Sequence, residues 1–311
     1  MDVVLDVDPG VDDAMAILMA LSSPELNVVA LMVVSGNVPL DTGVENARRI
    51  LAFAGRSDIP VYRGADRPLV RDPVHAMEVH GPSGLGNAVL SPSDVTARSD
   101  ASGYLVDLLE DAERAITILA VGPLTNLALA EWAFPGILRR ADAIVVMGGA
   151  VDVPGNATPT GEFNFVADPN AASVVVGAGS DLALVPLDVT RQVGVSADEV
   201  ERIRSLDSER AKFFAKATEV VIKRGTEADG YRGIFLHDPT AVAFAIEPGG
   251  FESEELWASV ETDGSLTSGQ LVVDRRRGVA GAEPVGSPIS VTMKVDAESV
   301  LDLFRKRVLE G

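Results

Sequence analysis

The sequence predicts an α/β protein built on an open, mostly parallel β-sheet with helices on both faces. Strand-like and helix-like segments alternate along most of the chain, and this order is typical of parallel sheets whose crossovers are helical. The first run, residues 3–8, contains four apolar residues and indicates a buried strand. Pro9 and Gly10 end this run, and helical spacing of apolar residues begins directly after them.

The later elements follow from the same patterns. The expected strands are 3–8, 27–34, 115–121, 143–147, 182–187, 256–261, 270–273 and 289–295. The expected helices are 12–21, 41–55, 101–112, 124–133, 169–176, 197–224, 240–246 and 297–308, and Gly55 suits the end of the second. The irregular segments 71–99, 148–168 and 225–236 are long enough to shape a pocket. Because the chain has no repeat or long linker, residues 1–311 are expected to form a single domain.

Composition excludes several classes of function. The chain has 46 acidic and 26 basic residues and a formal net charge of −20, so neither nucleic acid nor a membrane surface is an expected partner. Cysteine is absent, which excludes disulfides, thiolate nucleophiles and iron–sulfur clusters. No apolar run approaches the ~18 residues of a membrane span, and we expect a cytoplasmic protein. The acid excess fits a salt-adapted host or a GC-rich genome equally well.

Four carboxylates gather at the first crossover. Asp6, Asp8, Asp12 and Asp13 lie at the end of the first strand and in the first helical turn, at the sheet edge where open α/β folds bind ligands. The helix dipole accounts for one or two acids there, but not for four. Because such carboxylates repel each other, a hard cation with oxygen ligands is the favoured interpretation. A phosphate loop is disfavoured, since it needs glycine N–H groups and a lysine.

Other polar segments point to the same edge. Asn37 follows the second strand, Gly122 follows the third, and Met147 ends the fourth. Residues 161–165, with Asn156 before them, place an acid, amides and aromatics in one loop that could grip sugar hydroxyls or simply be a turn. In isolation, His237-Asp238-Pro239 is more simply a helix cap with an incidental histidine.

Taken together, these motifs resemble the nucleoside hydrolases, in particular the inosine–uridine-preferring, ribonucleoside group. Residues 6–14, DVDPGVDDA, follow the amino-terminal signature of that family. Four further motifs recur in the order and spacing of the family and span nearly the whole chain: His80-Gly81, residues 122–126, residues 162–164 and residues 237–239. The resemblance implies a Rossmann-like sheet, a bound Ca²⁺ and hydrolysis of the N-glycosidic bond of ribonucleosides to ribose and a free nucleobase. It also implies a homodimer or homotetramer.

The resemblance also assigns roles to residues. It implies calcium ligation by the carboxylates of Asp8, Asp13 and Asp238 and by the backbone carbonyl of Val121. Asp8 would also be the general base on a metal-bound water, and His237 would protonate the leaving base. The ribose-binding residues would be Asp12, Asn37, Met147, Asn156, Glu162 and Asn164. Phe163, His80 and His237 would face the base.

Two other functions stay open at this point. A catalytically silent ribose- or nucleoside-binding protein could use the same pocket, although simple binding needs neither a base nor an acid. A phosphatase of the haloacid-dehalogenase type would share Asp6-Val7-Asp8, but Gly10 stands where that pattern needs Thr or Val. Purine against pyrimidine preference stays open as well, as do the roles of Tyr231 and Arg232 in the 225–236 loop.

Overall fold

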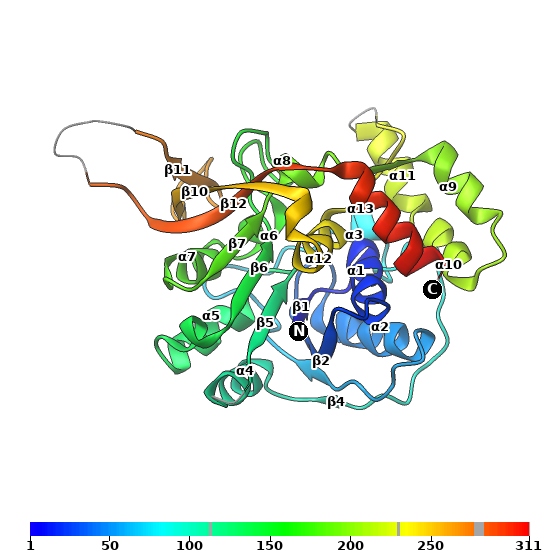
Figure 1. Cartoon of the computed structure of the whole chain (residues 1–311), viewed down its shortest axis with the longest axis horizontal. Coiled ribbons are helices and arrows are strands. Elements are labelled where there is room, and N and C mark those ends of the chain that lie inside the picture. Colours follow the sequence, from blue (N-terminus) through cyan, green and yellow to red (C-terminus); the bar gives the residue numbers. More distant parts are fainter. Residues whose placement is uncertain (112–113, 229–230, 277–282, 311) are drawn as a thin grey trace.

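A ten-stranded sheet forms the centre of the protein, of which the computed structural model describes residues 1–111, 114–228, 231–276 and 283–310 (Figure 1). From one edge to the other the strands are β11 (Leu271–Asp274), β10 (Phe251–Val260), β12 (Ser287–Val295), β7 (Leu182–Val185), β6 (Ala143–Met147), β5 (Ile116–Ala120), β1 (Asp2–Val7), β2 (Asn27–Val33), β3 (Val61–Arg63) and β4 (Ala97–Arg98). Neighbours from β12 to β4 are parallel, and β10 is antiparallel to both β12 and β11. The predicted fold class is therefore confirmed.

Alternation along β1 builds a hydrophobic core on each face of the sheet. Val3, Leu5 and Val7 belong to one core and Val4 to the other, and all four are buried. The helices of the first core include α1 (Val11–Leu21), α2 (Leu40–Phe53), α12 (His237–Ile246) and α13 (Ala297–Phe304). Those of the second are α4 (Ala101–Glu110), α5 (Thr125–Ala133) and α7 (Pro169–Gly177). No helix in the described ranges is long and apolar enough to cross a bilayer.

Helix boundaries follow local chemistry. The expected glycine stop of α2 is confirmed, because Gly55 follows the last turn with φ +70°, a conformation that costs little without a Cβ. The helix expected at 101–112 ends at Glu110, and Ala112 lies outside the described residues. At the start of α12 the structure differs from the prediction: the helix begins at His237, so Pro239 occupies its third position and not its first.

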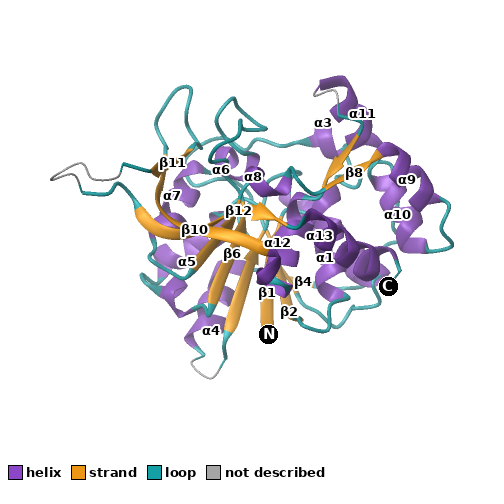
Figure 2. Ribbon diagram, turned by 45° about the horizontal axis from the view of Figure 1, so that its top comes forward, coloured by secondary structure: helices purple, strands orange, loops and turns teal. Residues whose placement is uncertain are grey.

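The predicted helical stretch 197–224 is three helices, α9 (Ala197–Arg204), α10 (Glu209–Ala217) and α11 (Glu219–Ala228). Ser208 starts α10 by accepting a hydrogen bond from the backbone N–H of Ala211, which breaks the continuous helix. Figure 2 shows these helices gathered beside α3 (Met77–His80) and a small antiparallel sheet of β8 (Gly194–Ser196) and β9 (Gly233–Phe235). The segments expected to be irregular also contain α6 (Phe163–Ala167), while α8 (Leu187–Thr190) directly follows β7.

Candidate active site

A cavity of about 410 Å³ opens at the carboxyl ends of the parallel strands. Asn37, Val121 and Met147 reach it from the ends of β2, β5 and β6, which is where open α/β sheets bind ligands. The predicted site residues that line it are Asp12, Asn37, His80, Val121, Met147, Asn156, Glu162, Phe163, Asn164, His237 and Asp238. Asp8 and Asp13 do not line the cavity. They are buried beside its floor.

A cluster of carboxylates from two helix starts lies at the floor of the cavity and just beneath it. Asp12 and Asp13 lie in the first turn of α1 and Asp238 in the first turn of α12, and one carboxylate oxygen of each lies within 4.8 Å of the others. Because α1 packs against α12, residues more than two hundred positions apart along the chain meet here. Burial raises the pKa of Asp238 well above its usual range, and the charges of Asp12 and Asp13 raise it further.

A hydrogen-bond network fixes Asp13. Its carboxylate accepts from the backbone N–H of Asp8 at 2.9 Å, from that of Gly10 at 2.9 Å, and from the Asn37 side-chain amide at 3.0 Å. These bonds favour the charged carboxylate, but burial and the Asp12 charge prevail and raise its pKa. These three hydrogen bonds thus fix the Asp13 carboxylate beside the other acids.

Asp8 has one satisfied and one unsatisfied oxygen. Its Oδ2 accepts from the Asn37 backbone N–H at 2.6 Å, whereas Oδ1 is buried without a hydrogen-bond partner among the described residues. Burial raises its pKa well above the ordinary value, and the neighbouring Asp13 adds to the shift. A Cβ at Gly36 would overlap Oδ2, and one at Gly122 would lie 2.8 Å from Oδ1, so two glycines make room for this carboxylate.

These acids fit a divalent cation. Asp12 Oδ1, like Asp8 Oδ1, is buried and unpartnered, and within the described ranges no Lys or Arg pairs with Asp8, Asp12, Asp13 or Asp238. Burial of like charges without a counter-charge is unfavourable, and a hard ion with oxygen ligands relieves it. The donor set is all oxygen, as Ca²⁺ and Mg²⁺ require.

Asp6 does not belong to this cluster, contrary to the grouping from sequence. Its Oδ1 accepts from the Asn126 side-chain amide at 2.7 Å, its Oδ2 is buried without a partner among the described residues, and it does not line the cavity. Burial raises its pKa to about 8, which favours the neutral carboxyl at pH 7. Asn126 in turn accepts from the backbone N–H of Ala65, which ties the end of β1 to α5 and to the loop after β3.

The predicted ribose-binding side chains form one wall. Glu162 caps α6 by accepting from the N–H groups of Asn164 and Phe165 and also accepts from Gly149, while burial raises its pKa to about 7. The Asn164 amide donates to the carbonyls of Val121 at 2.7 Å and Met147 at 3.1 Å. The Val121 carbonyl therefore shares its lone pairs between this bond and any metal ion.

Asn156 and Phe163 are joined at the same wall. Asn156 Oδ1 accepts from the Phe163 backbone N–H at 2.9 Å, so the loop before α6 closes onto the start of that helix. Asp188 and Arg191 fix an earlier part of this loop, residues 151–155, by hydrogen bonds to its backbone. Asp188 accepts from the N–H groups of residues 151 and 152, and Arg191 donates to the carbonyls of residues 154 and 155.

Two of the predicted base-facing residues are neutral histidines. His80 Nδ1 accepts from the Val11 backbone N–H at 3.1 Å, so its ring proton lies on Nε2, and burial lowers its pKa to about 4. His237 Nδ1 lies 2.7 Å from the Thr190 hydroxyl. Burial, with a smaller contribution from the Arg191 charge, lowers the pKa of His237 to about 3. Both rings are therefore uncharged at neutral pH.

A second wall comes from segments whose contribution the sequence left unspecified. Val221 and Arg224 of α11, Phe235 of β9 and Tyr231 line the cavity there, and His75 lines it beside Gly36, whose carbonyl oxygen lies 2.8 Å from His75 Nδ1. Tyr231 stacks on Phe235 with ring centroids 4.5 Å apart. Arg232 does not line the cavity, and its carbonyl accepts from the Ala197 N–H. Residues 229 and 230 of the same loop lie outside the described residues.

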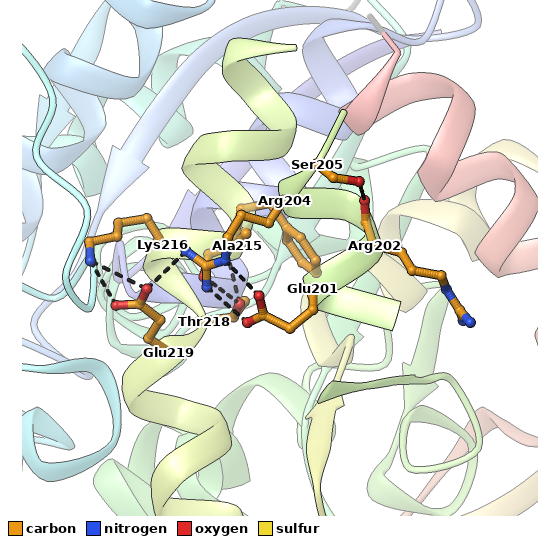
Figure 3. A network of polar contacts seen from close by, with 9 residues as sticks. Glu201, Arg202, Arg204, Ser205, Ala215, Lys216, Thr218 and Glu219 are labelled. Atoms are coloured by element: carbon orange, nitrogen blue, oxygen red, sulfur yellow. Dashed lines mark hydrogen bonds and ion pairs between the residues drawn. The ribbon is translucent and has the colours of Figure 1, made fainter. Parts of the chain in front are cut away.

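A polar network fixes α11 at this wall (Figure 3). Glu219, at the start of α11, accepts from Arg204 at 2.9 Å and from Lys216 at 2.9 Å, and Arg204 also pairs with Glu201. Asn87 donates to the same Glu219 carboxylate at 2.8 Å, so the segment that follows His80 is tied to α11. Glu219 thereby joins the start of α11 to α9 and α10 and also to the segment after His80.

Comparison with known proteins agrees with this arrangement. The family model described as inosine-uridine preferring nucleoside hydrolase matches residues 3–302. The pyrimidine-specific ribonucleoside hydrolase RihA of Citrobacter koseri is 38% identical, over 98% of this chain and 97% of the relative. A solved plant nucleoside hydrolase superimposes with a TM-score of 0.92 and 35% identity, covering 100% of this chain and 99% of that one. The purine-preferring ribonucleoside hydrolase from Gardnerella vaginalis superimposes with a TM-score of 0.90 and 30% identity, covering 100% and 98%. The chain belongs to the inosine-uridine preferring nucleoside hydrolase family.

Proposed function

We propose that this protein hydrolyses the N-glycosidic bond of ribonucleosides with the help of Ca²⁺, and that Asp8 is the general base and His237 the proton donor. The observation that carries the proposal is the Asp12–Asp13–Asp238 cluster at the floor of a cavity whose walls bear amides, a glutamate and histidines. A panel of ribo- and deoxyribonucleosides, assayed for released sugar with calcium and with chelator, tests it. Release that is equal with chelator would contradict the calcium requirement.

Asp8, Asp13, Asp238 and the Val121 carbonyl would hold the ion. A bound calcium ion supplies positive charge that orients sugar hydroxyls and makes an attacking water easier to deprotonate. Asp8 Oδ1 is the acceptor for the proton of that water, because it lacks a hydrogen-bond partner and because burial makes the carboxylate a stronger base than usual.

The ribose wall stabilises the charge that develops on the sugar. Cleavage at C1′ builds oxocarbenium character, which nearby carboxylates stabilise. Asp12 and Glu162 would supply that negative charge, and the wall residues Asn37, Met147, Asn156 and Asn164 would hold the sugar in place. Preorganised bonds such as those from Asn164 to two strand-end carbonyls keep this wall rigid.

The nucleobase would leave past Phe163, His80 and His237. It departs as an anion unless it is protonated, and His237 is the proposed donor. Donation requires the imidazolium form of His237, because a neutral imidazole is a very weak acid; the lowered pKa makes this form scarce at neutral pH but a strong acid when it is present. Thr190 orients the ring through Nδ1, which leaves Nε2 for the base.

The proposed substrate class is ribonucleosides, purine and/or pyrimidine, since one relative is named pyrimidine-specific and another purine-preferring. A silent binding protein is the alternative, and stable nucleoside binding without ribose release would favour it. The cytoplasmic location and the homodimeric or homotetrameric state stay predictions from the sequence.

His237→Ala is expected to depend strongly on the leaving group. We expect inosine and uridine hydrolysis to fall by about 10²–10⁴-fold, the usual contribution of general acid catalysis, and p-nitrophenyl riboside hydrolysis to fall by less than about tenfold. The reason is that p-nitrophenolate needs little protonation to leave. Steady-state rates on the three substrates are the measurement, and equal losses on all of them would remove His237 from the acid role.

Calcium is expected to stabilise the fold. An ion that binds only the folded chain adds about 2.7 kcal/mol at a concentration one hundred times its dissociation constant, so the melting temperature should rise by several degrees. Calorimetry with added calcium and with chelator measures this shift. Asp238→Asn removes one carboxylate charge of the cluster and should reduce the shift. An identical melting temperature with calcium and with chelator for the wild type would contradict the site.

A further inference from the structure

His75 is the one histidine to which the proposed mechanism gives no role. The chain contains three histidines, and His75, His80 and His237 all line the same cavity. His75 comes from the segment just before α3, within a stretch that sequence patterns left irregular. It is half-buried, whereas its neighbour Ala76 is buried and Met77 is exposed.

The ring of His75 has one nitrogen engaged and one available. Nδ1 lies 2.8 Å from the carbonyl oxygen of Gly36. Because a carbonyl oxygen only accepts, Nδ1 carries the ring proton, and Nε2 of the neutral imidazole is an acceptor. Nε2 has no hydrogen-bond partner in the part of the chain that the structure describes, and the residue lines the cavity.

The engaged nitrogen binds the turn that holds Asp8. Gly36 leaves the space that the Asp8 carboxylate fills, and the next residue, Asn37, donates its backbone N–H to Asp8 Oδ2. Asn37 also accepts, through its carbonyl, a hydrogen bond from the backbone N–H of Ala76 at 3.0 Å. The segment that carries His75 is therefore joined to this turn at two consecutive residues.

We propose that His75 has two roles in this site: Nδ1 holds the Gly36–Asn37 turn against Asp8, and Nε2 accepts a hydrogen bond from a donor group of the bound nucleoside. This inference rests on the proposed function. The donor is either a ribose hydroxyl or an N–H of the base, which are the two kinds of donor a ribonucleoside offers. His75 thus links substrate contact to the placement of the general base.

Two amide substitutions separate the roles. In His75→Asn the side-chain amide N–H can replace Nδ1–H toward Gly36, but nothing replaces Nε2. We expect KM to rise about tenfold, the upper effect of one neutral hydrogen bond, with kcat within about twofold of the wild type. In His75→Gln the amide reaches the position of Nε2, and the bond to Gly36 is lost. We expect kcat to fall about tenfold and KM to change little.

The substrates identify the donor. p-Nitrophenyl riboside has the ribose hydroxyls but no base N–H. A rise in KM of His75→Asn on inosine, uridine and p-nitrophenyl riboside alike assigns the contact to the sugar, and a rise on the two nucleosides only assigns it to the base. Wild-type KM for His75→Asn on all three overturns the contact, and wild-type kcat for His75→Gln overturns the positioning role.

Met77→Ala is the matched control, because Met77 is exposed on the same segment and does not line the cavity. It should keep wild-type kcat and KM, and all variants should keep the wild-type melting temperature within a few degrees. If the wild type releases no ribose, the proposed function fails, and inosine and uridine are instead titrated calorimetrically into wild type and His75→Asn. Weaker binding by the variant still supports the contact, whereas equal affinity, or binding by neither protein, overturns it.

Discussion

Asp13→Ala is expected to abolish both calcium binding and ribose release. The Asp13 carboxylate contributes to the acid cluster and also accepts hydrogen bonds from Asp8, Gly10 and Asn37, so its loss removes a ligand and loosens the residues around it. A metal ion is worth several kcal/mol to transition-state charge, and about 4 kcal/mol corresponds to a fall of about 10³-fold in rate. Titration calorimetry with calcium and a reducing-sugar assay measure the two effects.

The control for this variant is Asp207→Ala. Asp207 is fully exposed and lies 3.5 Å from the exposed Lys212, a surface pair of the kind that contributes little. Calcium affinity and turnover should both equal those of the wild type. Full activity in Asp13→Ala, with calcium still bound, would refute the placement of the ion.

Gly36→Ala is expected to have the second-largest effect, although it removes no functional group. The backbone of Gly36 is not in the left-handed region, so alanine meets no conformational penalty there. Its Cβ, however, would overlap Asp8 Oδ2 and approach Pro123 to 2.7 Å. The carboxylate or the turn must move, and a displacement of about 1 Å can cost about 10²-fold in rate. We expect kcat to fall by that factor.

Gly177→Ala provides the matched control. Gly177 ends α7, and a Cβ there would meet no atom within 4 Å. Its turnover should equal that of the wild type. The melting temperature of Gly36→Ala should fall by several degrees, since overpacking a buried turn costs about 1–3 kcal/mol. An unchanged kcat in Gly36→Ala would contradict this prediction, because it would show that an added Cβ beside the Asp8 carboxylate does not disturb catalysis.

The sequence was sufficient to predict the carboxylate site but not the role of each acid. Alternation along β1 predicts that Asp6 and Asp8 lie on the same side of the strand. It does not predict which residues they form hydrogen bonds with. The partner of Asp6 is Asn126, 120 residues further along the chain, and burial raises the pKa of Asp6 although the bond from Asn126 lowers it. Only the folded chain distinguishes the two.

Short and irregular segments limited the prediction of the pocket. β3 and β4 span three and two residues, too few for a period to be visible. His75 stands in a segment without periodicity, so its proximity to Gly36 could not be inferred. The helix break between α9 and α10 depends on the Ser208 cap, which competes with strong helical spacing over the whole stretch.

The meeting of α1 with α12 at the acid cluster has a consequence for the order of folding. Asp13 and Asp238 are separated by most of the chain, so the ion-binding floor exists only once a very large loop has closed. Contacts of such long range form late and slowly. Binding of the cation should therefore be one of the last events of refolding. The bound ion would then join the start of α1 to the start of α12.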